Sequence, residues 1–153
     1  FSSEPIFNPS KHVFEYVGSH EMVHIITTSQ LGRFKTSFFG EGYSNAIDGN
    51  YGSKMLENVL SRYNIDSSLA NIILNGKLLS PSELLYNNTL QPRLYYPQVG
   101  CLLNWLFDTY GAEKINKLYG LKRRKIENAF FEVTGVRFDD MEKQYLNYRL
   151  KIE

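Results

Sequence analysis

The sequence HEMVH, from His20 to His24, sets two histidines four residues apart, with a glutamate directly after the first. Residues i and i+4 of an α-helix share one face, about 6 Å apart along the axis. Two imidazoles so placed can bind one tetrahedral ion, with metal–nitrogen bonds of about 2.0–2.1 Å. Glu21 lies about 100° round the same helix, where its carboxylate can address a water on the metal without being a ligand. The stretch therefore predicts a helix that carries two metal ligands, His20 and His24, and one base, Glu21.

The flanking sequence favours a long helix around this motif. Asn8-Pro9 is a start signal, since a proline at the first helical position lacks an N–H that would be unpaired anyway. No proline interrupts residues 11–30, and Leu31-Gly32 is a stop signal. Apolar residues cover much of the circumference, which predicts a helix buried on more than one side. These residues are Phe14, Val17, Met22, Val23, Ile25 and Ile26. The alternative role of the two histidines is that of core side chains hydrogen-bonded to backbone or glutamate.

A glutamate between two glycines is the candidate for a third ligand. Glu41 follows His24 at a distance that allows the first helix to end and the chain to return antiparallel. It would complete a set of two histidines and one glutamate, with water in the fourth position, which is the open arrangement of a catalytic zinc. Considered alone, Glu41 is better explained as a carboxylate stabilised at a helix N-terminus. The motif upstream favours the ligand role.

The pattern H-E-x-x-H followed by E-G-x-x-N resembles the gluzincin metallopeptidases, the group that includes thermolysin and the aminopeptidase N type. The resemblance implies that His20, His24 and Glu41 bind one Zn²⁺ and that Glu21 is the catalytic base. In thermolysin-like members an aspartate one turn after the ligand glutamate orients a ligand histidine. Asn45 holds that position here, and its amide oxygen can accept an imidazole N–H with less charge support. The expected function is zinc-dependent hydrolysis of peptide bonds, with a peptide or protein as the substrate.

The residue that stabilises the oxyanion is left open by the resemblance. The aminopeptidase N type has a tyrosine for this task, and the matching position here is Pro97. Tyr95 and Tyr96 directly precede it, and either could turn into the site, since the chain before a proline is expected to be extended. The other interpretation is that both are amphipathic surface tyrosines.

The remaining sequence predicts further helices. Residues 52–63 and 67–74 have helical patterns, and Ser80-Pro81-Ser82-Glu83 is a capping-box start. Residues 87–97 are expected to form a loop, followed by helices at 97–110, 112–118, 126–135 and from Phe138 onward. This succession resembles the helical C-terminal lobe of small bacterial peptidase-like gluzincins, over about residues 9–150. The expected fold is mainly α: the helical lobe of a zincin-like metallopeptidase, with a zinc helix, a glutamate helix and a C-terminal helical bundle.

One domain is expected over residues 1–153, which is long enough to bury a core. The resemblance implies a β-sheet before the zinc helix, with an edge strand that binds the substrate backbone. Residues 1–8 suffice for one short strand. Either the sheet belongs to sequence upstream of this chain, or the fold is a reduced, mainly helical version with little or no β-sheet.

Composition sets few further limits. Hydrophobic residues make up 42% and charged residues 22%, as in soluble globular proteins. The net charge of +1 implies no general attraction to nucleic acid, and no apolar run is long enough for a membrane span. Cys101 is the single cysteine, which excludes an internal disulfide. The residues fix neither the compartment nor the oligomeric state, and only the resemblance points to an exported or cell-surface bacterial protein.

Two other functions compete with a peptidase. One is a binding or structural domain of a larger exported protein, which retains zinc but does not hydrolyse peptide bonds. The absent sheet favours it, and the intact Glu21 opposes it, because a non-catalytic zinc site has no need of that carboxylate. The other is a helical bundle without a metal, which metal analysis of the purified protein would distinguish.

Overall fold

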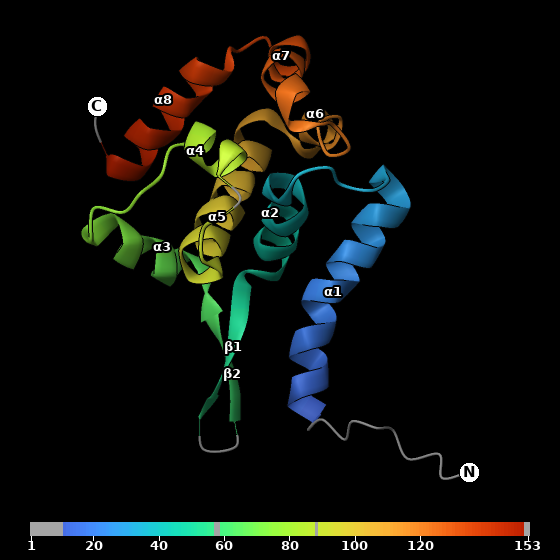
Figure 1. The fold of residues 1–153 in the computed structure, drawn as a ribbon, viewed down its shortest axis with the longest axis vertical. Coiled ribbons are helices and arrows are strands. Elements are labelled where there is room, and N and C mark those ends of the chain that lie inside the picture. Colours follow the sequence, from blue (N-terminus) through green and yellow to red (C-terminus); the bar gives the residue numbers. More distant parts are fainter. Residues whose placement is uncertain (1–10, 57–58, 88, 152–153) are drawn as a thin grey trace.

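The computed structural model describes residues 11–56, 59–87 and 89–151, and the side chains of these except 11–18 and 53–61. The described chain is mainly α, as predicted, with 73% helix and one two-stranded sheet. The start signal at Asn8-Pro9 and the strand expected in residues 1–8 lie outside the described residues. In chain order the elements are α1 (Lys11–Leu31), α2 (Ser37–Asp48), β1 (Asn50–Leu56), β2 (Val59–Asn64), α3 (Ile65–Leu74), α4 (Pro81–Tyr86), α5 (Pro92–Tyr110), α6 (Ala112–Asn116), α7 (Arg123–Thr134) and α8 (Phe138–Leu150) (Figure 1).

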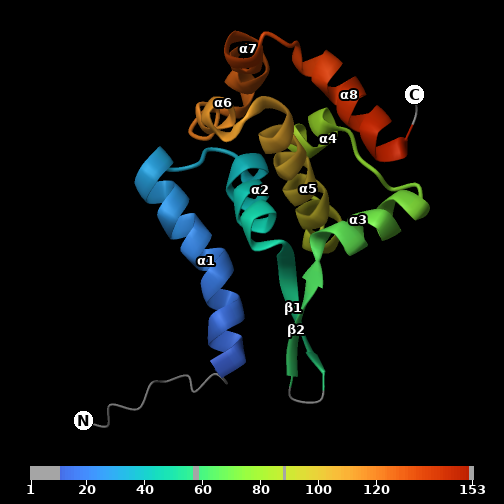
Figure 2. The same cartoon turned by 180° about the vertical axis from the view of Figure 1, so that it is seen from behind.

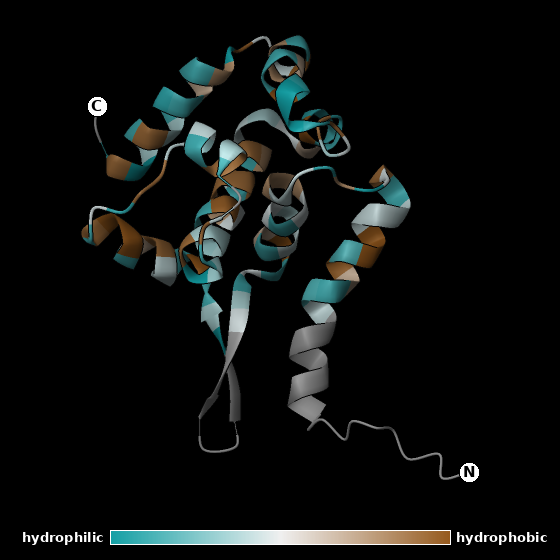
Figure 3. Ribbon diagram, viewed as in Figure 1, coloured by the Kyte–Doolittle hydropathy of each residue, from teal (hydrophilic) through white to brown (hydrophobic). Residues whose placement is uncertain are grey.

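The centre of the fold is the pair of helices α2 and α5, which pack together more extensively than any other described pair. Two glycines allow this close approach. A Cβ atom on Gly42 would lie 2.8 Å from Leu103 Cδ2, and one on Gly100 would lie 2.9 Å from Asn45 Cβ. Figure 3 shows hydrophobic residues along α5, where they join a core shared with α2, α4 and the C-terminal helices. The packing fixes α2 in place, and α2 carries Glu41.

Helix α1 lies at the side of this body and packs mainly against α2 (Figures 1 and 2). It ends as predicted, because Gly32 has a φ of 82° and donates its N–H to the Thr28 carbonyl at 3.0 Å. The prediction of burial on more than one side is wrong for the half whose side chains are described. Met22, Ile25 and Ile26 are 53%, 63% and 54% exposed, since α2 and β2 cover only one face of the helix.

The described residues of 52–63 belong to strands β1 and β2, which form a β-hairpin, so the helix predicted there is wrong. Strands β1 and β2 pair antiparallel, and Tyr51 lies opposite Tyr63 with the two rings stacked at 5.4 Å. Tyr51 is buried against the body of the protein, and Arg62 forms an ion pair with Asp48 at the end of α2. Contacts of this kind are invisible in a local window, and they override its helix propensity.

Helix α5 begins at Pro92, so the loop predicted at 87–97 is wrong over its second half. Pro92 occupies the start of the helix, where proline is favoured. Pro97 lies inside the helix and removes one intrahelical hydrogen bond, but the buried side chains of Tyr95 and Val99 hold the helix on both sides of it. The helices α3, α4, α6, α7 and α8 confirm the predictions for those segments, apart from their ends.

Two smaller predictions also have structural outcomes. Cys101 is a buried core residue, as predicted, and burial raises the pKa of its thiol to about 12. Within the described part of the chain, every helix is too short or too polar to cross a lipid bilayer.

Candidate metal centre

The three predicted ligands come together between α1 and α2. His20 and His24 lie one turn apart on α1, and Glu41 lies on α2, which packs against that helix. The Nε2 atoms of the two histidines are 3.2 Å apart. They lie 3.3 Å (His20) and 3.7 Å (His24) from the two carboxylate oxygens of Glu41. Among the described residues, this is the one group of His, Cys, Asp or Glu side chains with the spacing of a metal site.

The donor set and its dimensions fit a zinc ion. Tetrahedral bonds of about 2.0–2.1 Å separate neighbouring ligand atoms by roughly 3.3–3.4 Å, close to the observed separations. The side chains of His20, His24 and Glu41 are 16%, 18% and 21% exposed, so the group is partly shielded and still open to solvent. Two nitrogens and one carboxylate leave a fourth position for water, which a catalytic zinc requires.

Glu41 lies in the second turn of α2, which is set by the start of that helix. Thr36 is the N-cap, and its hydroxyl accepts a hydrogen bond from the Phe39 N–H at 3.4 Å. Helix-dipole effects are confined to the first turn. Stabilisation at a helix N-terminus therefore does not explain Glu41, and its ion-pair partners among the described residues are the two histidines.

Ser44 contacts Nδ1 of His24, the ring nitrogen that is not the predicted metal ligand. Its Oγ lies 3.0 Å from His24 Nδ1, and Ser44 is fully buried. A neutral histidine that binds a metal through Nε2 carries its proton on Nδ1. The serine oxygen is placed to accept a hydrogen bond from that N–H. Ser44 was not predicted from the sequence, because the resemblance points only to the position one turn after Glu41. The position three residues on also faces α1.

Asn45 does not make the contact expected of it. Its Nδ2 donates to the Glu41 carbonyl at 2.8 Å, and its buried Oδ1 has no hydrogen-bond partner among the described residues. His20 Nδ1 is likewise buried and without a partner in the described structure. The two histidines are therefore supported unequally: Ser44 contacts the second nitrogen of His24, and no described residue contacts that of His20.

Replacement of the supporting hydroxyl should weaken the site. We expect Ser44→Ala to lower zinc affinity by about 10–100-fold, because His24 loses the acceptor that orients its ring. Competition with a fluorescent zinc chelator measures this. Ser29→Ala is the matched control, since Ser29 is exposed on α1 and its hydroxyl bonds only the Ile26 carbonyl of its own helix. Equal zinc affinity of Ser44→Ala and the control would contradict the role given to Ser44.

A buried ion pair fixes α1 beside α2 at the level of His20. The side chains of Arg62 and Asp48 are 6% and 8% exposed and pair directly. Asp48 Oδ1 also accepts a hydrogen bond from the Ser19 hydroxyl at 2.9 Å. Ser19 directly precedes His20, so the hairpin, α2 and α1 are joined one residue from the first ligand.

Tyr96, and not Tyr95, faces the ligand group. Burial raises the pKa of Tyr96, and the nearby charges of Glu41 and Glu21 raise it further. Tyr95 is buried and donates its hydroxyl hydrogen bond to the Leu84 carbonyl at 3.3 Å, which directs it away from the site. The interpretation of both as surface tyrosines does not hold. Both residues belong to α5, and neighbouring side chains of a helix point about 100° apart, so the two tyrosines face different directions.

Two hollows have predicted site residues in their walls. One, of about 560 Å³, runs along α1 and has Glu21 and His24 in its wall. The other, of about 340 Å³, lies between the hairpin and the start of α5, with Tyr51, Tyr63 and Tyr96 in its wall. The first hollow therefore gives a ligand access to Glu21 and His24, and the second gives access to Tyr96.

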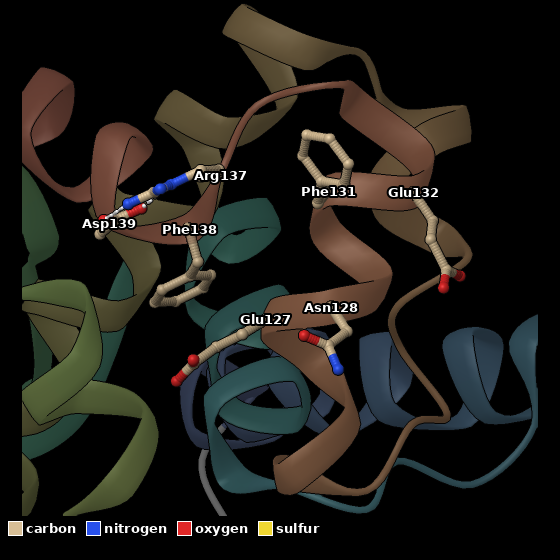
Figure 4. Close-up of a pocket in the computed structure, with 7 residues that line it drawn as sticks. All are labelled: Glu127, Asn128, Phe131, Glu132, Arg137, Phe138 and Asp139. Atoms are coloured by element: carbon tan, nitrogen blue, oxygen red, sulfur yellow. Dashed lines mark hydrogen bonds and ion pairs between the residues drawn. The ribbon is translucent and has the colours of Figure 1, made fainter.

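A third hollow lies between α7 and the start of α8, away from the predicted site residues (Figure 4). Its volume is about 680 Å³. Three of its charged groups are already engaged: Arg137 pairs with Asp139, and Glu127 accepts a hydrogen bond from the Tyr86 hydroxyl at 2.7 Å. We assign no role to it.

Comparison of the chain with protein-family models, with curated proteins and with solved structures finds no match. The likeness to gluzincins therefore rests on the motif residues, and the chemistry of the site has to be inferred from its own geometry.

Proposed function

We propose that this chain is the zinc-binding catalytic part of a metallopeptidase, with its helices forming the lobe of a zincin-like fold. The observation that supports the proposal is the meeting of His20, His24 and Glu41 at 3.2–3.7 Å, with Glu21 on the helix of the two histidines. Zinc, when bound there, lowers the pKa of a water ligand and polarises a substrate carbonyl.

Glu21 is available for acid–base chemistry. It is exposed, it lies in the same wall as His24, and it forms no ion pair with any described residue. A carboxylate in this position accepts the proton of the attacking water and delivers it to the leaving amine. The role of general base and then acid is thus assigned to Glu21.

Tyr96 belongs to α5, and the charges of Glu41 and Glu21 both act on its hydroxyl. Its hydroxyl feels the charge of Glu41, and it is a protonated hydrogen-bond donor at neutral pH, because the pKa of tyrosine lies near 10 and burial raises it further. A donor of this kind stabilises the oxyanion that develops on the substrate carbonyl. Tyr96 is therefore the candidate that replaces the tyrosine expected at position 97.

Metal content and cleavage, measured on the same preparation, test the proposal. Protein purified without added zinc should contain close to one zinc per chain. It should cleave a fluorescently labelled unfolded protein such as casein, lose this activity with a chelator, and regain it with zinc. Stoichiometric zinc without cleavage would favour the zinc-retaining binding domain, and protein without zinc would favour the metal-free helical bundle.

The assignment of Tyr96 has its own test. Tyr96→Phe should lower kcat by about 10²–10³-fold with little change in KM, because one oxyanion donor is removed while the substrate still binds. Steady-state kinetics on a fluorogenic peptide measures this, with zinc content checked in parallel. Tyr95→Phe is the control, since the hydroxyl it removes bonds only the Leu84 carbonyl. Similar kinetics for both variants would remove Tyr96 from the mechanism.

A further inference from the structure

We propose that the hollow beside His24 is the substrate subsite that sets specificity, selecting an apolar side chain next to the cleaved bond and a carboxylate farther along the peptide. This inference rests on the proposed peptidase function. We call this hollow the Arg33 groove; its wall includes Glu21, His24, Ile25, Thr28, Arg33 and Phe34.

The Arg33 groove begins at the reacting groups. Glu21 and His24 are part of its wall, and the Phe34 ring lies 5.7 Å from the His24 ring. Its volume of about 560 Å³ exceeds that of one side chain. A peptide with its cleaved bond at the ligand group therefore has room to place its next residues in this groove.

The end nearest the ligand group is apolar and preformed. The Phe34 ring rests against Gly40, where a Cβ atom would lie 2.6 Å from the ring, and its edge meets Tyr119 at 6.3 Å. Phe34 remains 36% exposed and Ile25 63% exposed. An apolar substrate side chain would cover both surfaces and displace water from them, which favours binding. The residue adjoining the cleaved bond is therefore expected to be apolar.

Arg33 adds a positive charge to the groove wall, and it follows the C-terminal end of α1. Arg33 is exposed and forms no ion pair with any residue of the described structure. Its guanidinium can bind a carboxylate with two parallel hydrogen bonds. The groove is thus negative at Glu21 and positive at Arg33, and this polarity fixes the direction in which an anionic peptide end lies.

The length of the groove defines where the carboxylate must be. From Glu21 to Ser29, both in the wall, α1 rises by about 12 Å at 1.5 Å per residue. An extended peptide covers that length with roughly three to four residues at about 3.3 Å each. The substrate class is a peptide with an apolar residue beside the cleaved bond and a carboxylate about three residues beyond it. That carboxylate is either the C-terminus or an acidic side chain.

Three matched peptides separate the two sources of the carboxylate. They share one sequence and end three residues past the cleaved bond with a free C-terminus, with a C-terminal amide, or with an amide and an aspartate at the last position. KM is measured for the parent protein. Dissociation constants are measured by calorimetry with zinc-loaded Glu21→Gln, so that binding is read without turnover.

For the parent we expect the amide peptide to bind about fivefold more weakly than the free acid, the size expected for one exposed ion pair. Arg33→Gln should abolish this difference, and Lys35→Gln should keep it, since Lys35 is also exposed and lies outside the groove wall. Recovery of affinity by the aspartate peptide would identify any carboxylate as sufficient, and its absence would identify the C-terminus.

The apolar end of the groove is tested with two substrate peptides that differ only in the residue beside the cleaved bond, which is leucine in one and asparagine in the other. The parent should prefer leucine by about tenfold, and Ile25→Asn should reduce this preference without loss of stability because Ile25 is exposed. If the parent cleaves peptides but the Arg33 and Ile25 variants bind them equally well, the subsite proposal is wrong and the proposed peptidase function still stands. A parent that cleaves nothing and binds no peptide overturns both.

Discussion

Glu21→Gln should lower kcat for peptide hydrolysis by about 10²–10⁴-fold while the protein keeps its zinc. Glutamine has the shape of glutamate but cannot accept the proton of the attacking water. The three ligand side chains are unchanged, and Glu21 forms no ion pair with any described residue, so the substitution breaks no ion pair of the described structure. Steady-state kinetics and metal content, measured on one preparation, check both parts of the prediction.

Glu113→Gln is a suitable control for the loss of one carboxylate. Glu113 is on α6, with its side chain 90% exposed and only a surface pairing with Lys117. This variant should match the parent in kcat and zinc content. A Glu21→Gln protein that cleaves as fast as the parent would show that another group moves the proton, and loss of zinc from it would show that Glu21 supports the metal site.

The parts of the fold that could be predicted are those with a local signal. The capping box at Ser80 and Glu83 is present as predicted, with Ser80 Oγ accepting from the Glu83 N–H at 3.2 Å. Gly32 ends α1 in the left-handed conformation that a glycine stop signal implies. In each case the groups that decide the structure lie within a few residues of one another.

The errors arise where partners lie far apart in the sequence. The hairpin depends on the stacking of Tyr51 on Tyr63 and on the ion pair between Arg62 and Asp48, and no local pattern contains these pairs. The loop expected before Pro97 followed from the restriction that proline places on its neighbour. In the structure the buried face of α5 outweighs that restriction.

The candidate ligand residues could be named from the sequence, but the residues that orient them could not. Spacing alone places His20 and His24 on one face of a helix, but the register between α1 and α2 decides which residue stands behind them. That register places Ser44 at His24 and leaves Asn45 bonded to its own helix. The choice between the two tyrosines has the same origin: neighbouring residues on a helix point about 100° apart, so only one can face the ligand group.

Zinc should raise the stability of the parent strongly, and His24→Ala should remove that increase. The ligand atoms come from α1 and α2, which the folded state alone brings together, so binding energy adds to the free energy of unfolding. At a free zinc concentration 1,000 times the dissociation constant, the increase is about 4 kcal/mol. Thermal unfolding with buffered zinc, compared with unfolding in a chelator, measures it.

The increment that zinc adds, and not the stability itself, is the decisive quantity. His24→Ala also deletes the hydrogen bond to Ser44 and the ring contact with Phe34, so the metal-free variant should already be less stable than the parent. Gln30→Ala, an exposed change on the same helix, should keep the full zinc increment. Magnesium should stabilise none of these proteins, because it prefers oxygen ligands to imidazole nitrogen. If zinc stabilised the parent and His24→Ala equally, the ion would be bound elsewhere, and the close approach of the three side chains would belong to a helical bundle without a metal.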